Sequence, residues 1–178
     1  PADQISFNAS KDKFLTKRSE FLMDGREIPK QLLKKELTDT TFDHKITLSQ
    51  AEIGDEIGAL FEVNPIYYDL DKSNIRPDAA AELDKIVQVL KDNPNISIEL
   101  GSHTDARASA SYNLKLSQRR AESAVRYIIE HGIEAARIKA KGYGETQLIN
   151  GCSDGVDCSE EAHQENRRTE FKITDLND

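Results

Sequence analysis

The residues best placed to do chemistry are one aspartate and the basic side chains that follow it. Asp105 comes just after ISIELGS, whose alternating isoleucine and leucine residues predict a strand. In open α/β sheets, ligands bind at the carboxyl ends of strands. An aspartate there can accept an ammonium group, and Arg119 or Arg120 further along can bind a carboxylate through two hydrogen bonds. The pattern therefore predicts a receptor for a zwitterion such as the end of an amino acid.

A plain salt bridge between Asp105 and Arg120, beside a solvated helix, is the alternative interpretation of the same residues. The start of the helix bears on this choice. If Ser117 is the N-cap, Arg120 falls at the third helical position. The free N–H groups of the first turn would then point the same way and favour an anion.

Known catalytic and metal-binding motifs are absent from the sequence. It contains no GxSxG elbow, no P-loop and no HExxH motif. His103 lies two residues before Asp105, but no activated serine or cysteine accompanies the pair. The stretch from Asp69 departs from a calcium loop, because Asn74 stands where glycine is needed and Ala80 where a bidentate glutamate is needed. We therefore expect a protein that is not an enzyme and has neither metal nor cofactor.

Two cysteines, Cys152 and Cys158, close a short polar loop with the sequence GCSDGVDC. Their spacing does not fit a CxxC redox motif, and a metal site would find only His163 nearby. A disulfide is the favoured interpretation, and it implies an oxidising compartment such as the bacterial periplasm. Two free thiols in a flexible loop are the alternative.

Composition limits the classes of partner. The 178 residues include 24 Lys and Arg against 32 Asp and Glu, a net charge of −8. This balance argues against nucleic-acid binding, which depends on neutralising phosphates with basic side chains. No apolar run approaches the ~20 residues of a membrane-spanning helix. The residues from Pro1 onward lack the pattern of a targeting signal, and this does not place the protein in the cytoplasm.

From residue 62 onward, the pattern alternates between strands and helices. A first helix is expected from Pro77 to Asn93, and a second one ends before Gly132. A loop of roughly 20 residues carries the cysteines. Helical crossovers make the first strands parallel, so we expect a mixed sheet covered by helices. Residues 44–63 are expected to form strands or a clasp. The expected strands are EVNPIYYDL, ISIELGS, RIKAKGYGE and RRTEFKI.

Four stretches together resemble the OmpA-like peptidoglycan-binding domain: IYYDLDKSNIRPDAAAELDKIVQVL, IELGSHTDARASASYNLKLSQRRAESAVRYII, IKAKGYGE and NRRTEFKI. The most specific pattern is TD followed by NxxLSxxRA. This family includes the peptidoglycan-associated lipoprotein and the stator protein of the flagellar motor. The resemblance implies an α/β (α+β) sandwich of βαβαβ-loop-β order over residues 62–178. Residues 1–45 would form an extension and residues 46–61 a linker.

The resemblance also implies a ligand, the meso-diaminopimelate of the peptidoglycan stem peptide. In this family the position of Asp105 holds the ammonium group, and that of Arg120, not Arg119, holds the carboxylate. Arg167 and Arg168 match the closing NRR motif, which we interpret mainly as structural. The other pocket positions of the family match Tyr68, Asp69, Thr104, Asn113 and Leu116.

A cell-wall anchor in the periplasm, associated with the outer membrane of a Gram-negative bacterium, is the function that this resemblance implies. Other outer-membrane or secretion-system proteins are further expected partners. The cysteine loop resembles versions from Bacteroidetes. Residues 9–40 resemble the end of a carboxypeptidase-regulatory-like β domain, as in type IX secretion components. The alternative function is a scaffold of the same fold that docks an envelope protein.

Overall fold

The computed structural model describes residues 4–11, 14–22, 45–69 and 71–176, and divides into the compact units Pro1–Gln50 and Ala51–Asp178. In the first unit, β1 (Gln4–Ala9) and β2 (Lys17–Leu22) pair as antiparallel strands. His44 and residues 23–40, which are most of the segment likened to a carboxypeptidase-regulatory-like domain, lie outside the described residues.

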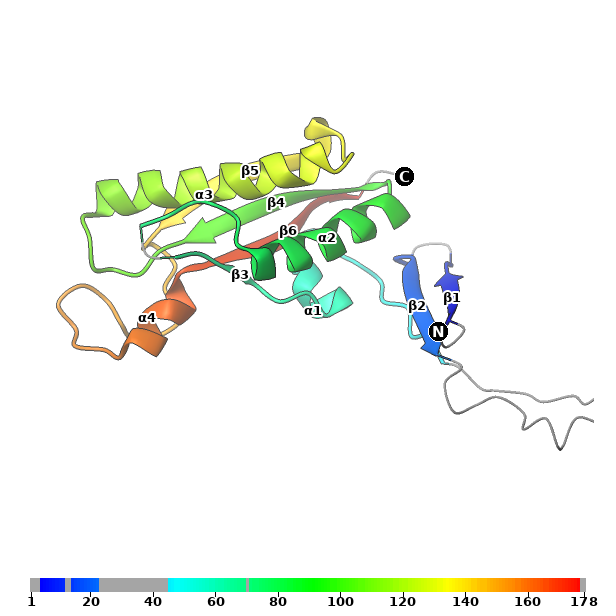
Figure 1. The fold of residues 1–178 in the computed structure, drawn as a ribbon, viewed down its shortest axis with the longest axis horizontal. Coiled ribbons are helices and arrows are strands. Elements are labelled where there is room, and N and C mark those ends of the chain that lie inside the picture. The colour runs from blue at the N-terminus through cyan, green and yellow to red at the C-terminus, as the bar shows by residue number, and fades with distance from the viewer. Residues whose placement is uncertain (1–3, 12–13, 23–44, 70, 177–178) are drawn as a thin grey trace, which may run out of the picture. The chain divides into compact units, whose positions relative to one another are not determined.

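The second unit is built on a four-stranded mixed sheet with the order β3-β6-β4-β5 (Figure 1). Strands β4 and β5 are parallel, whereas β6 runs antiparallel to both β3 and β4. This confirms the predicted α/β sandwich with a mixed sheet. The elements are α1 (Ile57–Phe61), β3 (Ile66–Tyr67), α2 (Pro77–Asp92), β4 (Ile96–His103), α3 (Ala110–Glu130), η2 (Ala135–Arg137), β5 (Ile138–Gly144), α4 (Glu160–Asn166) and β6 (Arg168–Leu176).

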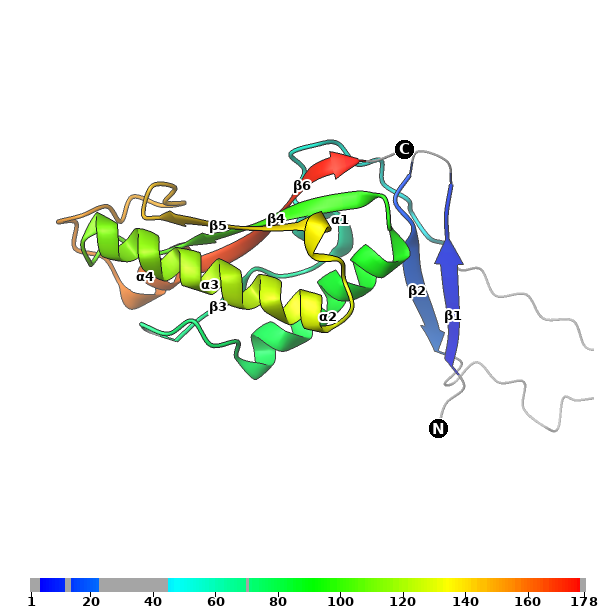
Figure 2. The same ribbon diagram turned by 90° about the horizontal axis from the view of Figure 1, so that it is seen from above.

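The core lies between the sheet and the two long helices. Helix α3 packs on β4 and β5, and α2 packs on α3 and β3 (Figure 2). Ile98 and Leu100 of β4 are fully buried beside Ile173 and Phe171 of β6. Each such side chain contributes about 1.5–3 kcal/mol by leaving water. This apolar layer fixes the strand ends at which the polar residues gather.

The first long helix follows its sequence signals, whereas the second follows them at its end, before Gly132, but not at its start. Helix α2 begins at Pro77 as predicted. Helix α3 begins at Ala110, where the Ser109 hydroxyl accepts a hydrogen bond from the Tyr112 backbone at 3.4 Å. The conditional choice of Ser117 as N-cap is therefore wrong. Both serines are cap-type residues. Between them only Asn113 and Leu116 are buried, so apolar periodicity does not distinguish the two positions.

Three other elements differ from expectation. Residues 57–61 form α1 rather than a strand, and just before this helix a Glu56–Lys172 bridge joins the chain to β6. The first strand is limited to Ile66–Tyr67, directly after Pro65, which has no N–H for a ladder. Helix α4 lies in what was expected to be an irregular loop.

Candidate ligand-binding site

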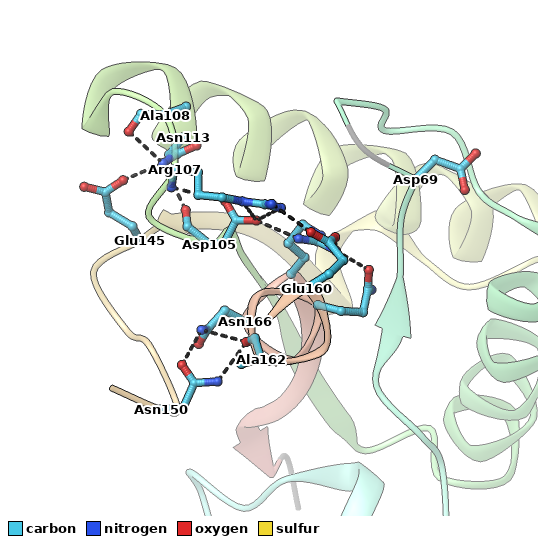
Figure 3. A network of polar contacts seen from close by, with 12 residues as sticks. Asp69, Asp105, Arg107, Ala108, Asn113, Glu145, Asn150, Glu160, Ala162 and Asn166 are labelled. Atoms are coloured by element: carbon cyan, nitrogen blue, oxygen red, sulfur yellow. Dashed lines mark hydrogen bonds and ion pairs between the residues drawn. The ribbon is translucent and has the colours of Figure 1, made fainter. Parts of the chain in front are cut away.

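The loop after β4 is held in place by backbone and amide hydrogen bonds. The Thr104 N–H donates to the Gly144 carbonyl of β5 at 2.9 Å. The Asn113 amide, one turn into α3, donates to the carbonyls of Asp105 at 3.0 Å and Ala108 at 3.3 Å. Asn113 also contacts the Glu145 carboxylate. These contacts fix the backbone that carries the Asp105 side chain (Figure 3).

Close packing between α3 and β5 fixes the position of the helix relative to this loop. The Ser117 hydroxyl accepts from the Gly144 N–H at 2.8 Å and donates to the Leu114 carbonyl at 2.9 Å. A Cβ at Gly142 would lie 2.3 Å from the Gln118 nitrogen, so this approach requires glycine. Ser117 therefore fastens the helix to the sheet instead of capping it.

A cavity of about 310 Å³ opens between the loop and the helix. Asn113, Leu116 and Arg120 line it from α3, where spacings of three and four residues place them on one face. Thr104 and Asp105 line it from the loop. The structure thus brings together five of the seven residues expected to bind ligand. The volume suits an amino-acid end group.

Arg120 is a fully buried cation in this cavity. Its Nε donates to the Lys72 carbonyl at 2.9 Å, and its Nη2 donates to the Asp69 carbonyl at 3.1 Å. Its Nη1 has no hydrogen-bond partner among the described residues. Loss of hydration lowers the pKa of Arg120 to about 10, which still leaves it charged at neutral pH. An unfilled donor on a buried guanidinium favours binding of an anion.

Asp105 is a mostly buried anion at the other side of the cavity. Its Oδ2 accepts hydrogen bonds from Arg107 Nη2 at 2.8 Å and Arg167 Nη1 at 2.7 Å. Burial alone would raise the pKa of Asp105, but the hydrogen bonds from these two arginines outweigh it and hold the pKa below its usual value. Asp105 is therefore ionised at neutral pH.

The predicted alternative of a simple Asp105–Arg120 salt bridge does not match the structure. Among the described residues, the ion-pair partners of Asp105 are Arg107 and Arg167, and no carboxylate lies within 4.0 Å of the Arg120 guanidinium. The Thr104 hydroxyl in the same cavity likewise has no partner within the described part of the chain. Opposite charges thus share a cavity without neutralising each other.

Tyr68 and Asp69 are near the cavity but are not among the described residues that line it. The Tyr68 ring lies beneath the Arg120 guanidinium, 5.0 Å from its central carbon, and its hydroxyl donates to the Arg120 carbonyl at 3.1 Å. Burial raises the pKa of Tyr68 to about 12. The Asp69 carboxylate instead pairs with Lys72 and Arg76, away from the cavity (Figure 3). Tyr68 thus positions Arg120 by packing its ring against the guanidinium, and Asp69 does so through its backbone carbonyl.

Two lining arginines were not predicted as site residues. Arg107 follows Asp105 by two positions, and Arg167 comes from the NRR motif that was interpreted as structural. The proximity of Arg107 was the one available signal, whereas Arg167 is 62 residues away in sequence. Arg168 points elsewhere and pairs with Glu170 at 2.5 Å. Of the two neighbouring arginines of α3, Arg119 is exposed and Arg120 is buried.

His103 does not form a dyad with Asp105. Its Nε2 lies 3.6 Å from the Glu170 carboxylate, and its ring stacks on Tyr143 with the centroids 5.1 Å apart. The described residues contain no group of three or more His, Cys, Asp or Glu side chains placed to hold a metal.

The cysteine loop is closed by a Cys152–Cys158 disulfide, as predicted. The loop leads through Ser159, whose hydroxyl caps α4, to Glu160. Asn166, at the end of α4, is fully buried and joins this loop to the helix. It donates to Asn150 Oδ1 at 2.6 Å and accepts from the Ile149 N–H at 2.8 Å. The segment is thus fastened at both ends.

Comparison with known protein families matches residues 67–162 to the OmpA family. The chain belongs to the OmpA family. Within the described residues, no helix of this OmpA-family chain is long and apolar enough to cross a membrane.

Relatives of this OmpA-family chain include a Rhizobium meliloti protein named peptidoglycan-associated lipoprotein, 36% identical over 89 residues, covering 50% of this chain and 51% of that protein. A Gloeobacter violaceus protein named photosystem I P700 chlorophyll a apoprotein A2 is 39% identical over 110 residues, which cover 61% of this chain and 12% of that protein. The crystal structure of the peptidoglycan-associated lipoprotein from Burkholderia pseudomallei has a TM-score of 0.56 and 27% identity, covering 62% of this chain and 89% of that one. This chain therefore spans about half the length of the Rhizobium meliloti protein and far less of the Gloeobacter violaceus protein.

Proposed function

We propose that this protein binds peptidoglycan non-covalently through the diaminopimelate of the stem peptide, and so anchors an envelope protein or complex to the cell wall. The observation that carries the proposal is the buried Arg120 guanidinium, whose Nη1 has no partner among the described residues, in the same cavity as the Asp105 carboxylate. The name of the Rhizobium meliloti relative supports the same function.

The end of the diaminopimelate side chain matches the two charges. It carries an ammonium and a carboxylate on one carbon, so Asp105 receives the first and Arg120 the second. Thr104 and Asn113 supply further polar contacts, and Leu116 supplies an apolar wall. Tyr68 and Asp69 hold Arg120 in place. Binding requires no bond to be broken, and the protein is proposed not to act as an enzyme.

We place the protein in the periplasm of a Gram-negative bacterium, at the outer membrane, in keeping with the disulfide and the named relatives. A Bacteroidetes origin and a place in type IX secretion stay predictions of the sequence.

Calorimetry with two soluble stem peptides tests the proposal. Lysine in place of diaminopimelate keeps the ammonium but removes the carboxylate, so Arg120 loses its partner. A charge-assisted hydrogen bond contributes about 1.5–3 kcal/mol, which corresponds to a loss of roughly tenfold or more in affinity. Equal affinity for both peptides would refute the zwitterion site.

Sedimentation with purified sacculi tests the anchoring role itself. The protein should sediment with sacculi whose peptides contain diaminopimelate and should leave their mass unchanged. Failure to sediment would favour the scaffold that docks an envelope protein, and loss of sacculus mass would indicate a hydrolase.

A further inference from the structure

Glu160 connects the two arginines that hold Asp105. Its Oε2 accepts a hydrogen bond from Arg107 Nη1 at 2.7 Å, and its Oε1 accepts one from Arg167 Nη2 at 2.6 Å. Both arginines also donate to Asp105 Oδ2. Two guanidinium groups and two carboxylates therefore form one closed group, with Arg107 between Asp105 and Glu160 (Figure 3).

The charges around the cavity show why the Glu160 carboxylate matters. Three guanidinium groups line it, those of Arg107, Arg120 and Arg167, against the carboxylates of Asp71 and Asp105. An incoming ammonium group would meet an excess of positive charge. Glu160 lies just outside the lining and adds a third negative charge. It forms ion pairs with Arg107 and Arg167, the same two arginines that pair with Asp105.

The two oxygens of Asp105 are used unequally. Oδ2 accepts the guanidinium hydrogen bonds, whereas Oδ1 accepts the Arg107 backbone N–H at 3.3 Å. A carboxylate oxygen can accept more than one hydrogen bond. Oδ1 is thus the atom with capacity for a ligand, provided that the guanidinium groups stay where Glu160 holds them.

We propose that Glu160 is a positioning residue that determines specificity for ligands bearing an ammonium group. It anchors Arg107 and Arg167 on one oxygen of Asp105 and offsets their charge, which leaves the other oxygen available. This inference rests on the proposed function, in which Asp105 receives the ammonium of the ligand.

The test uses Glu160→Gln in the full chain, with Glu161→Gln as the matched control. Glu161 is the next residue of α4 and is exposed. The probes are a diaminopimelate stem peptide and the same peptide acetylated on its side-chain amine. Glu160→Gln should weaken binding of the first by about three- to tenfold, as expected for one nearby charge, and leave the second within about twofold. Glu161→Gln should leave both unchanged.

An Asp105→Asn background shows whether Glu160 acts through Asp105. There, Glu160→Gln should change affinity for the unmodified peptide by less than about twofold, because coupled residues are not additive. Equal weakening of both probes, or full additivity, would indicate general support of the fold and overturn the inference. Wild-type affinity for Glu160→Gln would also overturn it. If the wild type binds neither probe, the proposed function itself fails.

Discussion

At the scale of single residues, the candidate site centres on Arg120, a buried cation with no ion-pair partner in the part of the chain that the structure describes. Arg120 is 0% exposed, and its guanidinium is held by two carbonyls and by the face of Tyr68. Burying a charge in this way is costly unless a partner completes the set. In keeping with the proposed function, we infer that a bound ligand completes the set at Arg120.

Arg120→Ala should weaken binding of the diaminopimelate peptide by at least about tenfold, because it removes charge-assisted hydrogen bonds. Arg119→Ala is the matched control, since Arg119 is exposed and about 100° further around α3. It should change affinity by less than about twofold. Calorimetry measures both, with circular dichroism to verify folding, and equal losses would contradict the assignment of Arg120. Arg120→Lys keeps the charge and tests whether the planar fork is needed.

The sequence identified the two charges but not their surroundings. Asp105 and Arg120 lie in a compact motif whose spacing indicated a shared site. Arg167 could not be placed in the same way, because its contact with Asp105 depends on how α4 and β6 return to the end of β4. The roles of Tyr68 and Asp69 also differ from expectation, since the Tyr68 ring is buried against Arg120 and the exposed Asp69 carboxylate pairs with Lys72 and Arg76.

At the scale of elements, α4 is the part of the site that periodicity could not reveal. It has seven residues, of which only His163 and Asn166 are buried, so no apolar face marks it. Hydrogen bonds of Asn150 and Asn166 nonetheless hold α4 in place, because they join the preceding loop to the helix (Figure 3). The disulfide closes the part of the loop that precedes α4.

Reduction of Cys152–Cys158 should lower the free energy of unfolding by about 2–2.5 kcal/mol, the loop-closure entropy of so short a ring. Affinity for the diaminopimelate peptide should change by less than about twofold, because the asparagine contacts keep α4 in place. Urea unfolding and calorimetry, with and without reductant, measure the two effects. A large loss of affinity on reduction would show that the disulfide itself holds Glu160.

Asn166→Ala provides the contrast. It leaves the disulfide intact but removes two donated hydrogen bonds and one accepted one at a fully buried position. Buried groups left without partners cost about 1–3 kcal/mol each. This variant should therefore both unfold more easily and bind more weakly than the wild type.

At the scale of the whole molecule, the contacts of Glu170 in β6 with His103 and Arg168 couple stability to pH. The His103 imidazole, 3.6 Å from one oxygen, and Arg168, 2.5 Å from the other, lower the pKa of Glu170 to about 2. A carboxyl whose pKa is lower in the folded state stabilises the fold above its unfolded pKa of 4.5. That contribution is lost progressively as the pH falls from 4.5 towards 2.

Glu170→Gln should therefore be less stable than the wild type at pH 6, and the difference should shrink as the pH approaches 2. Urea unfolding at a series of pH values measures both chains. A difference that stays constant over this range would show that Glu170 contributes packing rather than charge.

The strand order has a consequence for when this unit can form. Strand β6 is the last element in sequence, yet it lies inside the sheet, between β3 and β4. A nascent chain that has not reached Arg168 has no partner for Ile66–Tyr67 and leaves one edge of β4 open. Contacts so distant in sequence form slowly and late. We therefore expect this sheet to be completed only once Arg168–Leu176 is available, which is compatible with the export that the proposed periplasmic location requires.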